Sequence, residues 1–155
     1  MVKIVECNFN DTEQRKAIKD LMAHYMSDEM GGKQPMPSEE HLEQMVTGLE
    51  MNSVKLVLLA KKGKKYIGLS NCFINFGTFA AKPFINIHDI VVYKSERDSG
   101  VGRKLMEAIL DKAKILDCSK ITLEVRKDNL LAQHLYKSLG FGECHPVMHF
   151  WAKYL

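Results

Sequence analysis

The sequence of 155 residues lacks any apolar run of about 18 residues, the length that a membrane-spanning helix needs. Its first residues, MVKIVECNFND, also lack the long apolar segment of a secretion signal. The four cysteines form no C-x-x-C pair, and none has a histidine at zinc-ligand spacing. We therefore expect a reduced, cytoplasmic protein with no membrane span and no metal site.

Features of a nucleic-acid-binding protein are also scarce. The net charge is only +3, and no block of five like charges occurs. The densest basic run, from Lys61 to Lys65, is interrupted by Gly63 and is interpreted as a solvated hairpin turn rather than a phosphate-binding patch. No basic stripe with interleaved aromatic residues is present. We therefore expect no nucleic-acid partner.

The chain has no internal repeat, low-complexity segment or linker, so we expect one domain over residues 1–155. Hydrophobic spacing, capping residues and glycines then predict the elements. Helices are expected over residues 11–30, 38–49, 100–116 and 129–139. Strands are expected over residues 2–7, 55–61, 66–76, 84–93, 121–126 and 145–155. Hairpins in the first half and a strand–helix–strand unit in the second predict an α/β (α+β) mixed sheet with helices on both faces.

Two glycines, Gly100 and Gly102, stand where a predicted strand leads into a predicted helix. The start of a helix has unpaired N–H groups and partial positive charge, and glycine lets an anion approach the backbone. The Walker pattern is absent, and Leu105 occupies the third glycine position of the dinucleotide pattern. What remains is R-x-x-G-x-G, beginning at Arg97. The residues alone leave two interpretations open, an anion-binding loop or a glycine-rich turn with basic neighbours.

The R-x-x-G-x-G pattern after an apolar strand resembles the acetyl-CoA pyrophosphate loop of the GNAT N-acetyltransferase superfamily. A second block, NLLAQHLYKSLGF from Asn129 to Phe141, resembles that family's N-x-x-A-x-x-x-Y-x-x-x-G-F motif. The resemblance implies the GNAT acyl-CoA N-acyltransferase fold, which is a mostly antiparallel sheet with one parallel, splayed strand pair and helices on both faces. It also implies acetyl-CoA (coenzyme A) as the cofactor.

The stretch FGTFAAKPFINIHDIVV is similar, more weakly, to the diamine and polyamine acetyltransferase branch. That branch has an acidic residue near the amine where this chain has His88, whereas Asp89 matches the branch. The loop between Phe76 and Phe84 has no acidic cluster that would attract a polyamine. The departure at His88 leaves the acceptor open.

The resemblance also implies which residues bind the cofactor. The backbone of the strand at residues 90–92 would hold the pantetheine arm and polarise the thioester carbonyl, and the glycine loop would bind the pyrophosphate. Asp98 is expected to point outward, because a carboxylate beside a diphosphate is unfavourable. The expected cofactor-binding residues are Ile90, Val91, Val92, Arg97, Asp98, Ser99, Gly100, Val101, Gly102, Arg103, Asn129, Ala132 and Tyr136.

Acetyl transfer to an amine needs a base, because only about 0.04% of an ammonium group with a pKa near 10.4 is neutral at pH 7. His88 is the candidate base, directly or through a water, and the alternative is a half-buried histidine bonded to a neighbour. We expect its side chain to point away from the face of Ile87 and Asp89, and Asp89 to be structural. By the family match, Tyr136 would protonate or position the leaving sulfur, and its alternative is a core tyrosine.

The expected function is N-acetyltransfer from acetyl-CoA to a small primary amine, by direct attack in a ternary complex. One alternative is a protein or peptide N-acetyltransferase, and another, from a different class, is a non-catalytic acyl-CoA-binding sensor module. Acidic residues Asp28, Glu39, Glu40 and Glu43 could attract a cationic acceptor or could simply form a solvated face. The apolar segment at residues 148–155 fits either a homodimer interface or a core strand.

Overall fold

The computed structural model describes all residues, 1–155, and the chain divides into two compact units. The core unit comprises residues 1–124 and contains the whole sheet, and the C-terminal unit comprises residues 125–155. No helix in the chain has the length and hydropathy that crossing a membrane requires.

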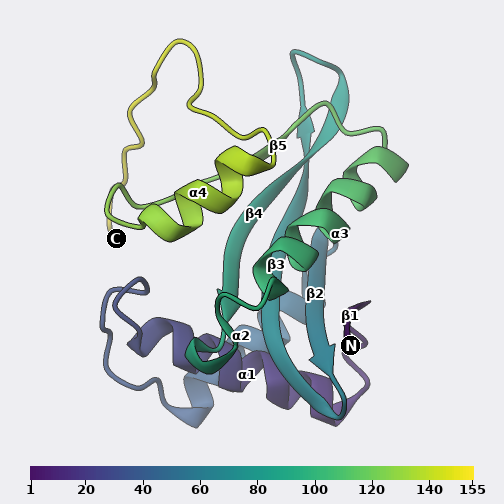
Figure 1. Cartoon of the computed structure of the whole chain (residues 1–155), viewed down its shortest axis with the longest axis vertical. Helices are drawn as coiled ribbons and strands as arrows, with labels where there is room; N and C mark the ends of the chain where they lie inside the picture. Colours follow the sequence, from purple (N-terminus) through teal and green to yellow (C-terminus); the bar gives the residue numbers. More distant parts are fainter. The chain divides into compact units, whose positions relative to one another are not determined.

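The core unit is built on a five-stranded sheet with the order β1-β2-β3-β4-β5 (Figure 1). Neighbouring strands from β1 to β4 are antiparallel, and β4 and β5 are parallel, which confirms the expected mixed sheet. The hairpin between β2 and β3 turns at Gly63, whose φ is +61°. The strands are β1 (Val2–Glu6), β2 (Lys55–Lys62), β3 (Lys65–Gly77), β4 (Lys82–Val92) and β5 (Ile121–Leu123).

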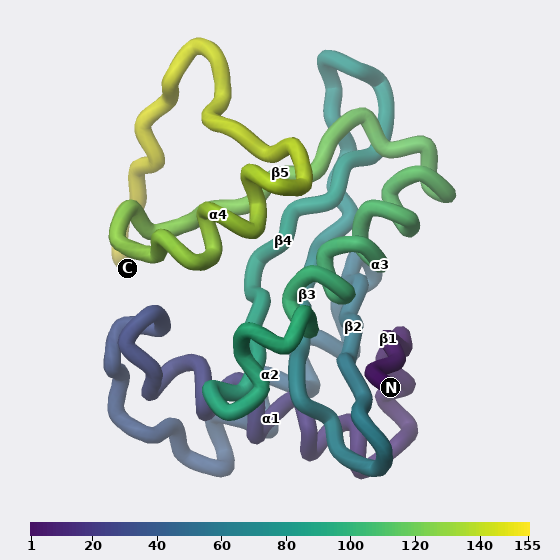
Figure 2. The backbone as a smooth tube through the Cα atoms, viewed as in Figure 1, coloured from purple at the N-terminus to yellow at the C-terminus, as the bar shows by residue number.

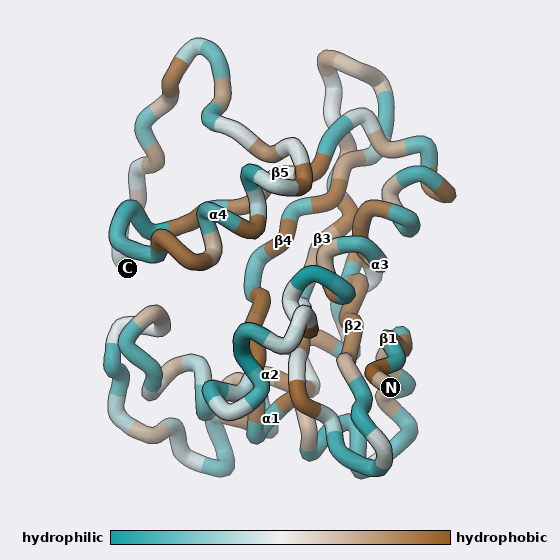
Figure 3. The backbone as a smooth tube through the Cα atoms, in the orientation of Figure 1, coloured by the Kyte–Doolittle hydropathy of each residue, from teal (hydrophilic) through white to brown (hydrophobic).

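Helices cover both faces of this sheet, as the sequence predicts. On one face, Leu69 and Val91 share a buried cluster with residues of α1 (Thr12–Ser27) and α2 (Glu39–Met51). On the other face lies α3 (Val101–Ile115), since a Cβ built on Gly68 would meet Val101 and Leu105 at 3.2 Å. Adjacent residues of a strand point to opposite faces, so Gly68 and Leu69 assign the two layers. The central strands are accordingly hydrophobic along much of their length (Figure 3).

Short polar side chains determine where the first two helices begin. Asp11 caps α1 by accepting from the N–H groups of Glu13 and Gln14, and Ser38 caps α2 by accepting from the N–H of His41. These caps satisfy N–H groups that have no partner inside the helix, so both predicted starts are confirmed.

The end of α1 differs from the prediction. The helix stops at Ser27 rather than near Met30, because Asp28 has an extended conformation with φ −73° and ψ 157°. The backbone N–H of Asp28 still donates to the carbonyl groups of His24 and Tyr25. The chain therefore leaves the helix at Asp28, before the two glycines at which the sequence suggested the stop.

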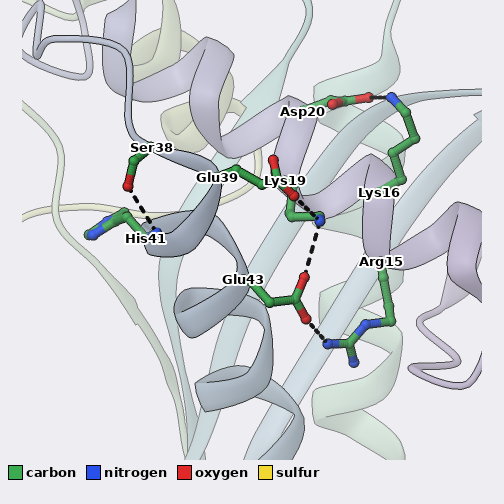
Figure 4. Close-up of polar contacts among 8 residues, drawn as sticks. All are labelled: Arg15, Lys16, Lys19, Asp20, Ser38, Glu39, His41 and Glu43. Atoms are coloured by element: carbon green, nitrogen blue, oxygen red, sulfur yellow. Dashed lines mark hydrogen bonds and ion pairs between the residues drawn. The ribbon is translucent and has the colours of Figure 1, made fainter.

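An ion-pair network joins α1 to α2 (Figure 4). Arg15 donates to Glu43 at 2.6 Å and to Glu50 at 2.5 Å, and Lys19 lies 2.5 Å from Glu39 and 3.1 Å from Glu43. The hydrogen bonds from Arg15 and Lys19 lower the pKa of the Glu43 carboxyl. Cations of α1 therefore neutralise these carboxylates, which favours a solvated helix face over an attractor for a cationic acceptor.

The C-terminal unit contains one helix, α4 (Leu130–Ser138), and Asn129 caps it by accepting from the N–H of Ala132 at 3.2 Å. Residues 145–155 form no strand, so the predicted closing strand is wrong. Apolar content favours a strand at this position, but a strand also needs a partner to complete its hydrogen bonds, and Pro146 has no N–H to donate. Nothing in the chain pairs with this segment.

Two glycine substitutions test how tightly α3 is seated. Gly68→Ala is expected to lower the free energy of unfolding by about 1–3 kcal/mol, because its Cβ would lie 3.2 Å from α3 side chains and from the Val91 carbonyl oxygen. Gly48→Ala is the matched control, because a Cβ in this exposed α2 position meets nothing within 4 Å. It is expected to raise stability by about 0.5–1 kcal/mol. Urea denaturation of both variants measures the difference, and equal effects would contradict the close packing of α3.

Candidate functional site

A short loop joins β4 to α3 (Figure 2), and two of its residues have a positive φ. After a short 3₁₀ turn (Lys94–Glu96), Asp98 has a φ of +61° and Gly100 a φ of +80°, immediately before α3 begins. A Cβ at Gly100 would meet nothing within 4 Å. Glycine is therefore favoured here by its left-handed conformation and leaves open space beside the backbone.

The start of α3 differs from the starts of the other long helices. Asp11, Ser38 and Asn129 cap theirs with side-chain oxygens, whereas no side chain caps α3 at Gly100 and its first turn has no acidic residue. Val101 is buried and anchors that turn against the sheet. An uncapped helix start with an open approach suits an anion such as a phosphate group.

The other loop residues are partly as expected. Asp98 is exposed, which is consistent with an outward carboxylate, and Ser99 donates its hydroxyl to the carbonyl of Glu96. The Arg97 guanidinium does not extend freely from the loop. Its Nε donates to the Val92 carbonyl at 3.3 Å, and its Nη2 donates to the Asp28 carboxylate at 3.0 Å. Sequence reasoning missed this use of Arg97, because its partner Asp28 lies 69 residues earlier, just after α1.

A β-bulge in β4 carries the candidate base. Asn71 pairs with Asp89 and Cys72 pairs with Ile87, so His88 is the extra residue of the bulge. The His88 side chain is exposed, and its ring meets the edge of the Phe73 ring at a centroid distance of 5.6 Å. A bulge bends the strand and redirects a side chain, and here that side chain is the imidazole.

The bulge corrects the expected side-chain alternation. Asn71 and Phe73 are two residues apart on β3 and therefore share a face of the sheet. The Asn71 amide donates to the Asp89 carboxylate at 3.0 Å, and Phe73 contacts His88. His88 and Asp89 consequently lie on the same face, whereas regular alternation predicts opposite faces. The extra residue supplies the physical reason.

Asn71 is a site residue that the sequence analysis missed. Its side chain is buried, with Nδ2 on Asp89 and Oδ1 without a hydrogen-bond partner. An amide held in this way keeps the Asp89 carboxylate at the bulge, which fits the structural role expected for Asp89. The polar pair Ser70–Asn71 inside an otherwise apolar strand was the available signal.

Strand β4 extends beyond its short parallel neighbour β5. Strand β5 pairs only with residues Ile85 to Ile87, whereas β4 continues to Val92 beside β3 alone. Ile90, Val91 and Val92 therefore lie beyond the last β5 partner. Their backbone groups on that edge are not used by β5, and an extended ligand can hydrogen-bond to such an edge.

The thiols of Cys72 and Cys7 are poor nucleophiles, because burial raises the pKa of each. Burial raises the pKa of Cys72 to about 11, and burial followed by the nearby Asp11 carboxylate raises the pKa of Cys7 to about 11. The thiolate is the reactive form, so both groups are unreactive near neutral pH.

The remaining predicted residues belong to the C-terminal unit. Tyr136 is buried, and its ring lies 6.1 Å from that of Phe141 between centroids. Asn129 uses its side-chain oxygen to cap α4, accepting from the N–H of Ala132. The predicted residues Ala132 and Tyr136 thus lie on one short helix that Asn129 caps.

The mixed sheet with its bulged strand and one parallel pair, together with the glycine-led helix start, has the features of an acyl-CoA N-acyltransferase fold. Residues 18–141 match the Acetyltransferase (GNAT) family, and this match covers most of the chain and residues of both units. The chain belongs to that family, whose members use acetyl-CoA as acetyl donor.

Individual relatives agree with this assignment. An N-alpha-acetyltransferase of Sulfurisphaera tokodaii is 34% identical over 68 residues, which are 43% of this chain and 41% of the relative, so the match spans less than half of that protein. The crystal structure of a probable acetyltransferase superposes with a TM-score of 0.84 at 19% identity, covering 99% of this chain and 98% of the other. AAC(6')-Iy in complex with the bisubstrate analogue CoA-S-monomethyl-acetylneamine superposes with a TM-score of 0.76 at 16% identity, covering 99% of each chain. These two structures share the fold.

Proposed function

We propose that the chain is an acetyl-CoA-dependent N-acetyltransferase that acetylates a small primary amine by direct attack in a ternary complex. The observation that carries the proposal is the junction of β4 with α3. Within the core unit, one strand carries an exposed imidazole at a bulge and leads through a short loop into a helix with an uncapped, open N-terminus. A base beside a bulged strand and an anion-binding loop are the two parts that this chemistry needs.

In the proposed complex, the pyrophosphate of acetyl-CoA binds the backbone N–H groups from Asp98 to Arg103. The pantetheine arm extends along the free edge of residues 90–92, as a strand would. A backbone N–H on that edge donates to the thioester oxygen as negative charge develops there. The aminoglycoside acetyltransferase relative that binds a CoA-containing bisubstrate analogue supports this cofactor.

The proposed reaction moves one acetyl group and includes two proton transfers, after which the His88 imidazolium releases its proton to solvent and the Tyr136 phenolate regains one from solvent. The neutral amine nitrogen attacks the thioester carbonyl carbon, and His88 accepts the amine proton, directly or through a water. The carbon–sulfur bond then breaks, and the leaving thiolate takes a proton from Tyr136. The pKa of Cys72 and that of Cys7 are each raised to about 11, which disfavours an acetyl-cysteine intermediate at either residue.

A small amine is the preferred acceptor, and a peptide amine is the second candidate. Exposed Phe76 and Phe79 at the β3–β4 hairpin provide apolar surface without an acidic cluster, which favours an amine that carries a hydrophobic body. The relative named as an N-alpha-acetyltransferase favours the peptide alternative.

The test measures binding and turnover separately. Calorimetry with acetyl-CoA is expected to give micromolar binding, and a thiol reagent is expected to detect CoA release that depends on an added amine. The amine panel contains alkylamines, aminoglycosides and peptides with free N-termini. Binding without amine-dependent release would support the sensor module instead, and no binding to the folded protein would refute the acetyltransferase.

The homodimer stays a prediction, and the C-terminal segment is its candidate surface. Apolar side chains there are largely exposed, and the segment pairs with no strand of its own chain. A second copy would cover such a surface. The exposed residues are Val147, Met148, Phe150, Trp151, Tyr154 and Leu155.

A further inference from the structure

We infer that Asp28 is a positioning residue of the pyrophosphate loop, because its carboxylate fixes the Arg97 guanidinium as a bridge between the end of α1 and the end of β4. The inference rests on the proposed function and concerns the organisation of the same site. It assigns Arg97 a different task from the one expected from sequence, where its charge acts on the phosphate directly.

The Arg97 guanidinium contacts two segments besides its own loop. Its Nη2 donates to Oδ2 of Asp28 at 3.0 Å, and its Nε donates to the carbonyl oxygen of Val92, the last residue of β4, at 3.3 Å. The side chain of Asp28 is only 13% exposed and that of Arg97 only 31%. A charge-assisted bond in this half-buried position restrains the first residue of the loop from two directions.

Asp28 is itself held rigidly, so it can serve as a fixed anchor. Its Oδ1 accepts from the N–H of Met30 at 3.0 Å, and its carbonyl accepts from the N–H groups of Gly31 and Lys33. Burial opposes ionisation of the carboxyl, but the Met30 N–H and the Arg97 guanidinium lower its pKa overall. The carboxylate therefore stays charged at every pH at which the protein would be assayed.

One further contact joins α1 to the end of β4, and the loop after α1 also packs closely on its own helix. The rings of His24, on the last turn of α1, and Tyr93, which follows β4, meet edge to face at 5.0 Å. A Cβ on Gly31 would lie 1.8 Å from the Tyr25 carbonyl oxygen, so the loop after α1 folds back closely on the helix end. The Asp28–Arg97 bond therefore joins two segments whose flanking residues are also restrained.

This arrangement has a consequence for substrate binding. Asp28 already neutralises the charge of Arg97 and binds one end of its guanidinium. The chief effect of Arg97 is therefore to position the backbone of residues 98–102. If that loop is displaced, the backbone N–H groups at the start of α3 lose their alignment with the phosphates. Removal of Asp28 should then weaken acetyl-CoA binding, although Asp28 carries a negative charge and would by itself repel the cofactor.

The experiment compares acetyl-CoA dissociation constants for Asp28→Asn, Arg97→Gln and the double variant. Asparagine keeps an oxygen for the Met30 N–H but removes the charge and the second oxygen, which accepts from Arg97. Each single substitution is expected to weaken binding about tenfold, and the double variant is expected to match the singles because one link is broken in each case. Steady-state kinetics are expected to show the loss in the KM for acetyl-CoA, with kcat nearly unchanged.

Asp20→Asn is the matched control, because it removes an aspartate of α1 that pairs with Lys16 on an exposed face. It is expected to leave acetyl-CoA binding unchanged. If Asp28→Asn does not fold, Asp28→Ser replaces it, since a hydroxyl also accepts from the Met30 N–H.

A direct contact between Arg97 and the phosphate would give a different pattern of acetyl-CoA affinities. If Arg97 acts on the phosphate directly, freeing it from Asp28 would leave binding unchanged or tighten it, and only Arg97→Gln would weaken it. That pattern would overturn the inference while leaving the acetyltransferase proposal intact. Absence of acetyl-CoA binding by the wild-type protein would overturn both.

Discussion

Gly100→Asp is expected to weaken acetyl-CoA binding by about 100-fold or more. The new carboxylate would stand at the residue before α3, in the open space where the pyrophosphate is proposed to lie. The carboxylate and the pyrophosphate carry like charges and would repel strongly at a separation of a few ångströms. The side chain would also occupy space that the phosphate needs. Calorimetric titration with acetyl-CoA measures the loss, and thermal unfolding shows that the variant is folded.

Two control variants separate the causes of this loss. Gly63→Asp has the same substitution at another glycine with positive φ and open space, in the β2–β3 turn, and is expected to bind acetyl-CoA normally. Gly100→Asn keeps the size of the side chain without its charge and tolerates the left-handed conformation, so it is expected to bind with intermediate affinity. Normal binding by Gly100→Asp would mean that the loop is only a tight turn.

Local sequence signals predicted the starts of elements better than their ends. Asp11, Ser38 and Asn129 each bond to N–H groups two or three residues away, so the information lies within one helical turn. The end of α1 depends instead on the extended Asp28, which is held by Arg97, 69 residues further along. The closing strand depends on a pairing partner, which apolar content alone does not supply.

The same distinction applies to the candidate site. The chemistry of His88 and the glycines was visible in the sequence, because residue type and spacing carry it. The bulge was not, because it arises from the register of β4 against β3, and a single inserted residue reverses the expected face. The Asn71–Asp89 bond, which joins residues 18 apart on two strands, was likewise missed.

His88→Ala is expected to lower kcat/KM by about 100-fold for an alkylamine at pH 7, with little change in acetyl-CoA binding. The physical reason is that the ammonium form predominates at this pH, so a base must take up its proton before or during attack. His41→Ala is the matched control, because His41 is an exposed histidine of the same unit at the start of α2. It is expected to leave kcat/KM unchanged. Initial rates of CoA release with saturating acetyl-CoA measure both variants.

The dependence on amine basicity identifies what His88 does. An amine with a pKa of about 7.5 is roughly one-quarter neutral at pH 7, so it needs a base far less than an alkylamine does. The defect of His88→Ala is therefore expected to shrink to a few-fold for such an amine, and to shrink for the alkylamine as the pH rises towards the pKa of that amine. A defect of constant size across amines and pH would instead assign His88 to acceptor contact or to packing against Phe73, whose ring it meets at the bulge. A loss of kcat/KM in His88→Ala that becomes smaller as the amine becomes less basic would instead assign His88 to proton removal from the acceptor amine, at the bulge in β4.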